Sequence, residues 1–410
     1  MSFKFVKRFP FVAKKEQVRE EIEKPLRFLE KGNHPKNRED AVQALRFILV
    51  EEKLTSYERK TVVSAITDEL YDPNPRVAAR TAYNLAEIDD TLRYTGINDP
   101  LDDHERKRAI KGMQWLYRMV KDDEEARKII YALSRFQDNS NIPLFRQSLS
   151  NVNWDVRKKA IIALADLNDY QSFGAIIDKI DDVFDVQKAV LYALEKFPSS
   201  VILQDKRVIP FLLRTLKDRK SYLRKEAASL LLLLESKQIN DALKDMILDH
   251  SDSNTKIAAI NILSIKGDET AITSIANVLN NEDVYVRREA VIALGRIKSP
   301  ACAPYLMYTL GQREPQDPKV SGEKNIENAR LIKLCALASI CALKTEGIEI
   351  AALDNMNEEE KKNFTIAFED YKRLLQEKPE FFDPWFYRVN GNGNGNGNGN
   401  GNSNGESGNH

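Results

Sequence analysis

An apolar helical pattern recurs about every thirty residues in the middle of the chain. In EDVYVRREAVIALGRI (282–297), Val286, Ala290, Leu294 and Ile297 fall on one face of a helix. Asp283 stands just before them, where a carboxylate can cap free N–H groups. The same pattern begins at lead positions spaced 30, 37, 32 and 31 residues apart: Val156, Val186, Leu223, Thr255 and Val286. Such a period is the signature of a stacked array.

A second apolar segment follows each of these helices after a short polar break. The five second segments are residues 170–180, 207–216, 239–248, 269–279 and 300–310. Each repeat is therefore predicted to be a helix–turn–helix, and Pro300 suits a first helical position. One such hairpin cannot bury its apolar face alone, so neighbouring repeats must stack. The predicted fold is all-α, an α-solenoid (superhelix) of stacked repeats.

The pattern D…VRxxAxxALxxI followed by A…L…L resembles the short HEAT-like repeat of the phycobilisome-lyase type. DVYVRREAVIALGRIKSPACAPYLMYTL is the best match, and the resemblance is clear over about 150–312. Weaker copies lie at 38–49, 75–88, 126–136 and 332–343. The resemblance further implies a structural ladder in which an acidic residue of one repeat pairs with an arginine of its neighbour. The ladder residues would be Asp155, Arg157, Asp185, Arg224, Asp283 and Arg287.

The array is expected to occupy residues 31–355, with two interruptions. Residues 89–104 and 313–328 are polar and turn-rich, which suits either solvated surface insertions or partner-contacting loops. Before the array, residues 1–30 form a basic and aromatic lead that is expected to cover the first repeat. Within it, residues 3–15 alternatively favour peripheral contact with an anionic membrane surface.

After the array, residues 356–389 are predicted to form a capping helix and an aromatic segment. A bare solenoid end exposes core, so a cap is required. Alternatively, the aromatic segment docks a partner through residues typical of binding hot spots: Trp385, Phe386 and Tyr387. The Asn/Gly tail, 390–410, has nothing to offset its ordering entropy and is predicted to be disordered.

Charge and cysteine usage narrow the class of protein. The chain has 62 basic and 62 acidic residues, which argues against a dedicated nucleic-acid binder. Three cysteines without a CxxC motif favour a reducing, cytoplasmic setting, and no apolar run is long enough to span a bilayer. One local basic cluster, 205–225, suits either an anion-binding patch or a solvated face. Its candidate binding residues are Arg207, Arg214 and Lys217.

Most motifs that carry catalysis are absent from the sequence. There is no HExxH, no GxxxxGK[ST] and no GxSxG. Deoxyhypusine hydroxylase, a HEAT-type enzyme, binds iron through repeated His-Glu pairs, whereas this chain has one, His104–Glu105. A single pair supplies too few ligands, so no metal site and no cofactor are predicted.

These observations leave three functional hypotheses. The first is a non-catalytic protein–protein interaction scaffold or assembly chaperone that grips a partner protein on its concave face. The second follows from the resemblance: a phycobilin lyase-like factor binding a linear tetrapyrrole and a phycobiliprotein subunit. Its candidate residues would be Arg214, Lys217, Tyr305 and Tyr308. The third is a nucleic-acid-binding HEAT-like protein, which the zero net charge disfavours.

Overall fold

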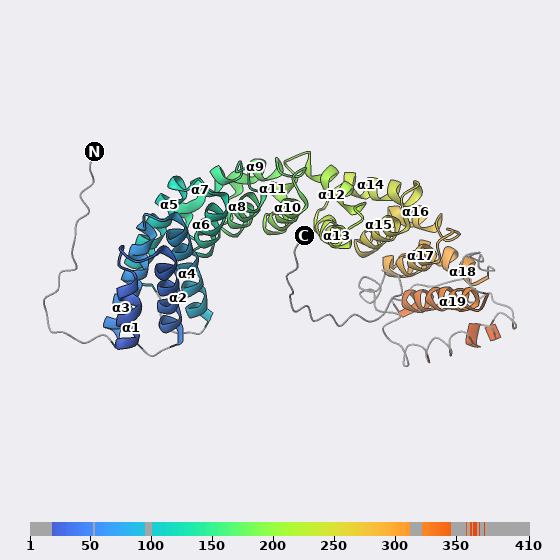
Figure 1. The fold of residues 1–410 in the computed structure, drawn as a ribbon. Coiled ribbons are helices and arrows are strands. Elements are labelled where there is room, and N and C mark those ends of the chain that lie inside the picture. The colour runs from blue at the N-terminus through green and yellow to red at the C-terminus, as the bar shows by residue number, and fades with distance from the viewer. Residues whose placement is uncertain are drawn as a thin grey trace, which may run out of the picture. The chain divides into compact units, whose positions relative to one another are not determined.

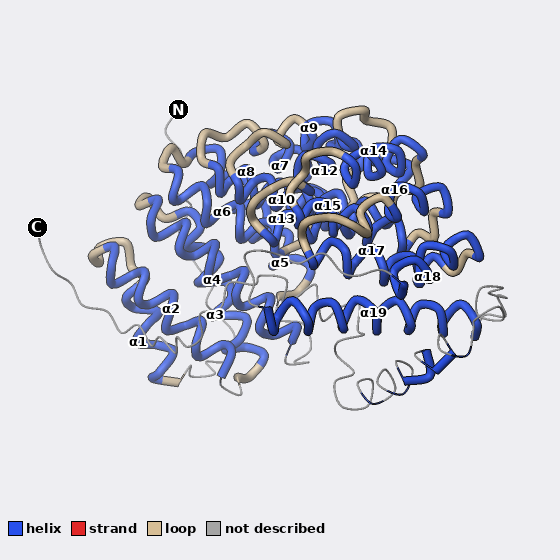
Figure 2. The backbone as a smooth tube through the Cα atoms, turned by 90° about the vertical axis from the view of Figure 1, so that its right-hand side faces the viewer, coloured by secondary structure: helices blue, strands red, loops and turns tan. Residues whose placement is uncertain are grey.

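Every element in the described part of the chain is a helix. The computed structural model describes residues 19–51, 54–94, 101–311 and 322–345, with isolated residues between 358 and 373. Figure 2 shows helices joined by loops and no strand among the residues drawn in colour, so the all-α prediction is confirmed. The chain divides into two compact units, Met1–Leu212 and Leu213–His410, and each is described by itself.

Unit 1 is built from two layers of helices (Figure 1). The inner layer follows the inner side of the unit's curve, with neighbouring helices packed in chain order: α2 (Pro35–Glu51), α4 (Pro75–Tyr94), α6 (Asp123–Arg135), α8 (Trp154–Asp166) and α10 (Phe184–Lys196). The outer layer contains α3 (Ser56–Asp68), η1 (Glu69–Tyr71), α5 (Asp103–Met119), η2 (Asn139–Asn141), α7 (Ile142–Ser148), η3 (Tyr170–Ser172) and α9 (Phe173–Ile177). α1 (Glu20–Phe28) packs on α2, and α11 (Ser199–Ile202) follows α10.

Unit 2 repeats the same two-layer plan, and α12 (Val208–Leu216) contains the division between the units. One layer comprises α13 (Ser221–Leu233), α15 (Ser253–Ile265), α17 (Val284–Ile297) and α19 (Gly322–Thr345). The other comprises α14 (Lys237–Leu248), η4 (Glu269–Ala271), α16 (Ile272–Ala276), η5 (Pro300–Cys302) and α18 (Ala303–Gly311). The repeat pattern therefore defines an all-α solenoid architecture in both units.

The predicted repeat helices form where the apolar periodicity places them. In α17, Val286, Ala290 and Leu294 are fully buried, and Asp283 caps the helix by accepting the Tyr285 N–H at 2.7 Å. Each of the five lead positions is the third residue of a helix, and the four weaker copies coincide with α2, α4, α6 and α19. Apolar periodicity locates these helices well because stacking buries the same face in every repeat.

In four repeats, a residue with left-handed backbone geometry follows the first helix. Gln137, Asn168, Gly267 and Lys298 have φ between 48° and 67° and follow α6, α8, α15 and α17. A residue at this position turns the chain sharply into the next helix. Only one of the four is glycine, so the tertiary fold holds the other three in a conformation that costs L-residues energy.

Helices extend into both of the segments predicted to be insertions, 89–104 and 313–328. α4 continues to Tyr94 and α5 begins at Asp103, because Asp102 and Glu105 form a capping box there. α19 begins at Gly322, within the second predicted insertion. At the amino-terminal side, α1 buries Ile22 against the first repeat. Residues 3–15, the aromatic segment 379–389 and the tail 390–410 lie outside the described residues.

A buried charge cluster joins the first two repeats of unit 1. Arg38 on α2 donates to Asp72 through Nε and Nη2, at 2.7 and 2.9 Å, and to the Asn33 carbonyl. Glu69 lies beside them, 7% exposed, with its Oε2 lacking a partner. Burial raises the pKa of Glu69 to about 8, helped by the hydrogen bond to Asp72 and by its negative charge. Burial also raises the pKa of Asp72, but hydrogen bonds from Arg38 and Asn74 outweigh it and hold that pKa below its usual range.

We expect Glu69→Gln to stabilise the protein progressively above pH 5. A carboxyl whose pKa is raised on folding holds its proton more tightly in the folded chain, so stability falls as pH rises from about 4.5 towards about 8. Glutamine removes that fall while still donating to Asp72. The gain should reach about 1–2 kcal/mol at pH 8, reduced because a buried amide oxygen is left without a partner.

Urea unfolding at pH 5 and pH 8 measures this effect. Asp40→Asn, which neutralises an exposed carboxylate of the same unit, is the control and should leave the pH profile unchanged. An equal effect of Glu69→Gln at both pH values would show that the Glu69 carboxyl is ionised in the folded protein.

Candidate functional site

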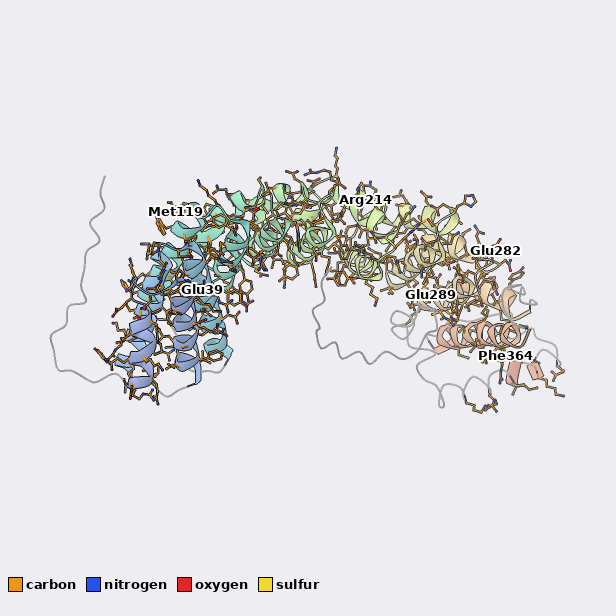
Figure 3. The ribbon with its side chains drawn as sticks, in the orientation of Figure 1. Glu39, Met119, Arg214, Glu282, Glu289 and Phe364 are labelled. Atoms are coloured by element: carbon orange, nitrogen blue, oxygen red, sulfur yellow. The ribbon has the colours of Figure 1, made fainter. Side chains whose placement is uncertain are left out.

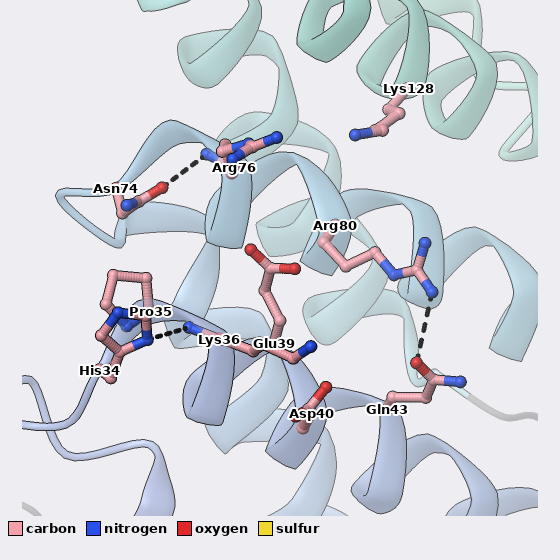
Figure 4. Close-up of a pocket in the computed structure, with 10 residues that line it drawn as sticks. All are labelled: His34, Pro35, Lys36, Glu39, Asp40, Gln43, Asn74, Arg76, Arg80 and Lys128. Atoms are coloured by element: carbon pink, nitrogen blue, oxygen red, sulfur yellow. Dashed lines mark hydrogen bonds between the residues drawn. The ribbon is translucent and has the colours of Figure 1, made fainter. Parts of the chain in front are cut away.

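A groove of about 680 Å³ opens at the amino-terminal end of the inner layer of unit 1. It crosses the first turns of α2 and α4 and reaches α6 (Figure 4). Its lining is mainly polar and charged: His34, Pro35, Lys36, Glu39, Asp40, Gln43, Asn74, Arg76, Arg80 and Lys128. Figure 3 labels Glu39 over the inner-layer helices of unit 1 and Met119 at the outer edge of the unit, so the groove belongs to the inner layer.

The backbone beneath the groove is held by local sequence signals. Pro35 and Pro75 open α2 and α4, where a missing N–H costs nothing. Asn74 accepts the Arg76 N–H at 3.0 Å, and His34 Nδ1 accepts the Lys36 N–H at 3.3 Å (Figure 4). The two helix starts are thus capped by their own chain, and the charged side chains project from ordered first turns.

One wall of the groove is cationic. Arg76 and Arg80 project from α4, and Lys128 projects from α6 (Figure 4). Their carboxylate partners are distant: Glu125 lies 3.9 Å from Arg76 Nε and 3.5 Å from Lys128 Nζ, and Glu124 lies 4.0 Å from Lys128 Nζ. Strong charge-assisted hydrogen bonds measure about 2.7–2.9 Å. Arg80 donates to a neutral oxygen, Gln43 Oε1, at 3.3 Å, so this wall keeps much of its donor capacity.

The opposite wall, from α2, has mixed charge. Lys36, Glu39 and Asp40 lie one turn or less apart on the helix. Figure 4 shows the Glu39 carboxylate pointing from α2 toward α4. A bound molecule would therefore meet cations on one side and both signs on the other.

A pair of stacked tyrosines continues the inner layer beyond the groove. The rings of Tyr83 on α4 and Tyr131 on α6 lie 5.3 Å apart with 22° between their planes. The Arg80 guanidinium lies 5.8 Å from the Tyr83 ring centre, and Lys159 Nζ of α8 lies 5.0 Å from the Tyr131 ring centre. Tyr131 donates to Glu87 at 3.1 Å; burial, then this bond, raises the pKa of Tyr131 to about 12.

Ion pairs link α6 to α8 and α8 to α10 along the inner layer. Asp155 lies 3.6 Å from Arg127 and 3.8 Å from Lys159, and Lys158 lies 3.6 Å from Asp185 of the next repeat. Burial lowers the pKa of Lys159. The surface is thus a mosaic of cations, aromatic rings and paired acids, suited to binding and without a paired nucleophile and base.

Sequence reasoning missed this site because its residues lie off the apolar stripe. Arg80, Lys128 and Lys159 occupy one register position of successive repeats, and Tyr83 and Tyr131 occupy another, three residues later. Off-stripe residues in a single helix suggest ordinary solvated surface. Comparing the same register across repeats would have shown a basic column beside an aromatic one, since equivalent positions of stacked repeats lie side by side.

The ladder arginines bind the loop of their own repeat. Arg287 donates to the Asn281 and Glu282 carbonyls at 2.7 and 3.0 Å. Arg157 and Arg224 make the same contacts with the carbonyls six and five residues before them. Arg157 also reaches Asp182 of the next repeat at 2.7 Å. These arginines therefore satisfy loop carbonyls, which explains their recurrence at one repeat position.

The residues predicted to bind anions or a tetrapyrrole lie on different elements of the structure. Arg207, in unit 1, pairs with Asp178 and Asp205 at 2.7 Å each. In unit 2, Lys217 lies 3.5 Å from Asp249, and Arg214 is on α12 (Figure 3). Tyr305 and Tyr308 lie on α18, with α14 and α16 between that helix and α12 (Figure 1). Within unit 2, the cations at the end of α12 are therefore separated from the tyrosines of α18.

Trp385, Phe386 and Tyr387 lie outside the described residues. Cys302 and Cys335 are buried, and burial raises the pKa of each thiol, to about 11 and about 12. Within the described ranges, no three His, Cys, Asp or Glu side chains gather as metal ligands, and no helix is long and apolar enough to cross a membrane.

A family model and two solved structures with TM-scores above 0.5 share the repeat fold of this chain. A family model of HEAT repeats matches residues 142–232 and 240–319. No curated protein matches the sequence. The karyopherin Kap121p bound to Nup53p aligns with a TM-score of 0.52 and 14% identity, over 93% of this chain and 42% of that chain. Kap121p bound to the SUMO protease Ulp1p gives 0.52 and 15%, over 92% and 42%. Human deoxyhypusine hydroxylase aligns with a TM-score of 0.28 and 19% identity, over 71% and 98%.

Proposed function

We propose that this chain, whose residues 142–232 and 240–319 are HEAT repeats, is a non-catalytic protein-binding scaffold or assembly chaperone. The observation that carries the proposal is the inner layer of unit 1. Its groove, tyrosine pair and exposed cations come from successive repeats and form one extended surface. A surface built this way binds an elongated partner, since each added repeat contributes another contact.

The composition of this surface supports a protein ligand. Tyrosine and arginine are enriched in protein-binding hot spots because they bury large area and donate hydrogen bonds at little cost in entropy. The solved Kap121p structures carry bound proteins on a fold of the same kind. The candidates for tetrapyrrole binding support that hypothesis less, since Lys217 lies 3.5 Å from Asp249 and Tyr305 and Tyr308 lie on another helix of unit 2.

Site-specific photo-crosslinking tests the proposal. A benzophenone amino acid at Gln43, which lines the groove, should crosslink to a protein in extract from the native source. The same probe at Met119, 61% exposed on the outer layer, is the control. A discrete adduct from Gln43 alone, identified by mass spectrometry, is the expected result; equal labelling at both positions would contradict it.

The identified partner then allows a quantitative test. We expect Tyr83→Ala with Tyr131→Ala to weaken its binding at least about tenfold, a loss of about 1.4 kcal/mol or more. Tyr71→Ala with Trp115→Ala is the matched control, because these rings also lie 5.3 Å apart but belong to the outer layer. If the Tyr83→Ala, Tyr131→Ala variant binds the partner with unchanged affinity and melts at an unchanged temperature, the partner does not bind at the tyrosine pair.

A further inference from the structure

We infer that the groove of unit 1 binds an acidic, extended polypeptide segment, with the segment's carboxylates against α4 and α6. This inference rests on the proposed function and names the chemistry of the partner. It begins from the asymmetry of the walls: Arg76, Arg80 and Lys128 share one side, whereas Glu39 and Asp40 stand on the other.

The cationic wall is incompletely neutralised. Glu125 is the carboxylate shared by Arg76 and Lys128, and it is 4% exposed, so it lies beneath the wall rather than over it. The exposed Glu124 lies 4.0 Å from Lys128 Nζ, but its close partner is Arg127, which is not part of the wall. Arg80 contacts the neutral Gln43 oxygen and the Tyr83 ring face. Neither contact cancels its charge, but both restrict the side chain, which lowers the entropy lost when a carboxylate binds.

An arginine held in this way is a specific carboxylate receptor. The guanidinium presents parallel N–H donors that match the two oxygens of Asp or Glu. Arg76 and Arg80 are one helical turn apart on α4, so they face the same side and can each take one acidic side chain. The acids of the α2 wall would then accept backbone N–H groups or basic side chains of the same segment.

The tyrosine pair defines the next contact along the layer. It adjoins Arg80 on α4 and leads away from the groove toward α8. A segment leaving the groove would lay an apolar or aromatic residue on these rings. An extended chain meets successive repeats in this way because its side chains emerge every few ångströms on alternating sides.

Nucleic acid fits this surface less well than an acidic polypeptide does. Glu39, Asp40 and Glu87 interrupt the cations, and Asp155 pairs with the lysines of α8. A phosphate backbone carries a charge at every nucleotide and would meet these acids repeatedly. A polypeptide can place its carboxylates only where the cations are.

A displayed library of random linear peptides, selected on the full-length chain, tests the inference. Enriched peptides should carry two or more Asp or Glu residues. Their affinity should fall at least about tenfold in Arg76→Glu with Arg80→Glu and should weaken as salt rises. Lys107→Glu with Lys111→Glu is the matched control: the same charge change one turn apart, exposed on the outer-layer helix α5, with binding expected to change less than about twofold.

The outcomes separate the inference from the proposed function. Acidic peptides are expected to bind the unaltered chain, and the same peptides with Lys in place of Asp or Glu are expected to prefer the Arg76→Glu, Arg80→Glu variant. This exchange of preference would establish charge pairing in the groove. Neutral or basic peptides that crosslink to Gln43 would overturn the acidic class while leaving the scaffold function intact. Binding of poly(U) RNA that is lost in the same variant would overturn both, as would peptides that bind without touching the inner layer.

Discussion

Arg38→Met is expected to destabilise unit 1 by about 3–5 kcal/mol, because it leaves buried carboxylates without their cation. The Arg38 and Asp72 side chains are 4% and 0% exposed, and Glu69 adds a second acid to the cluster. Lys31 contributes only a weaker electrostatic effect at Glu69. The Asn33 carbonyl also loses its donor. Urea unfolding monitored by circular dichroism gives the size of the loss.

The location and pH dependence of the loss distinguish this cause from general damage. Hydrogen exchange should accelerate first in residues 35–72. The loss of stability should grow between pH 5 and pH 8, because the carboxyls become charged as they lose protons and Arg38 no longer offsets that charge. Arg157→Met is the matched control. It removes the equivalent arginine where the pair is 15% and 12% exposed, so about 1–2 kcal/mol is expected. Equal losses in the two variants would contradict the special role of the buried cluster.

Gly295→Ala is expected to destabilise unit 2 by about 2–3 kcal/mol by forcing α17 and α19 apart. A Cβ at this position would lie 2.8 Å from the Ser339 Cα, a backbone atom that cannot rotate away. The bond from Ser339 Oγ to the Val291 carbonyl, 3.2 Å long, would be strained as well. The gain of about 1 kcal/mol in helix propensity is too small to compensate.

Thermal melting together with hydrogen exchange of α19 measures this effect. Gly174→Ala in α9 is the matched control: no atom lies within 4 Å of the added Cβ, so the change should be neutral or slightly stabilising. Adding Ser339→Gly to Gly295→Ala should restore part of the loss, since it removes the side chain but not the backbone contact. No recovery, or no initial loss, would show that the helix spacing adapts freely.

The position of Gly295 also illustrates what a sequence pattern leaves out. Within α17 it is a small residue one position after Leu294, and the periodicity alone gives it no role. Its importance comes from Ser339, which is 44 residues further along the chain and meets it only after the repeats have stacked. The same holds for Arg38 and Asp72, which belong to different repeats.

By itself, the sequence determined which segments form the repeat helices and in what order they follow one another. These depend on neighbouring residues: the spacing of apolar side chains fixes which face is buried, and residues such as Asp283 cap the helix they precede. The recurrence of one pattern also determined the solenoid architecture, because identical apolar faces can be buried only by stacking.

Only the tertiary structure decided where a ligand would bind. The groove joins residues of α2, α4 and α6 from across almost a hundred positions, and the stacked Tyr83 and Tyr131 come from separate repeats. Side-chain proximity across repeats depends on how the helices register against one another. The same packing turned the arginines of the predicted ladder, Arg157, Arg224 and Arg287, toward loop carbonyls. Their repetition in sequence marks a structural requirement, because every loop between stacked helices has carbonyls that need donors.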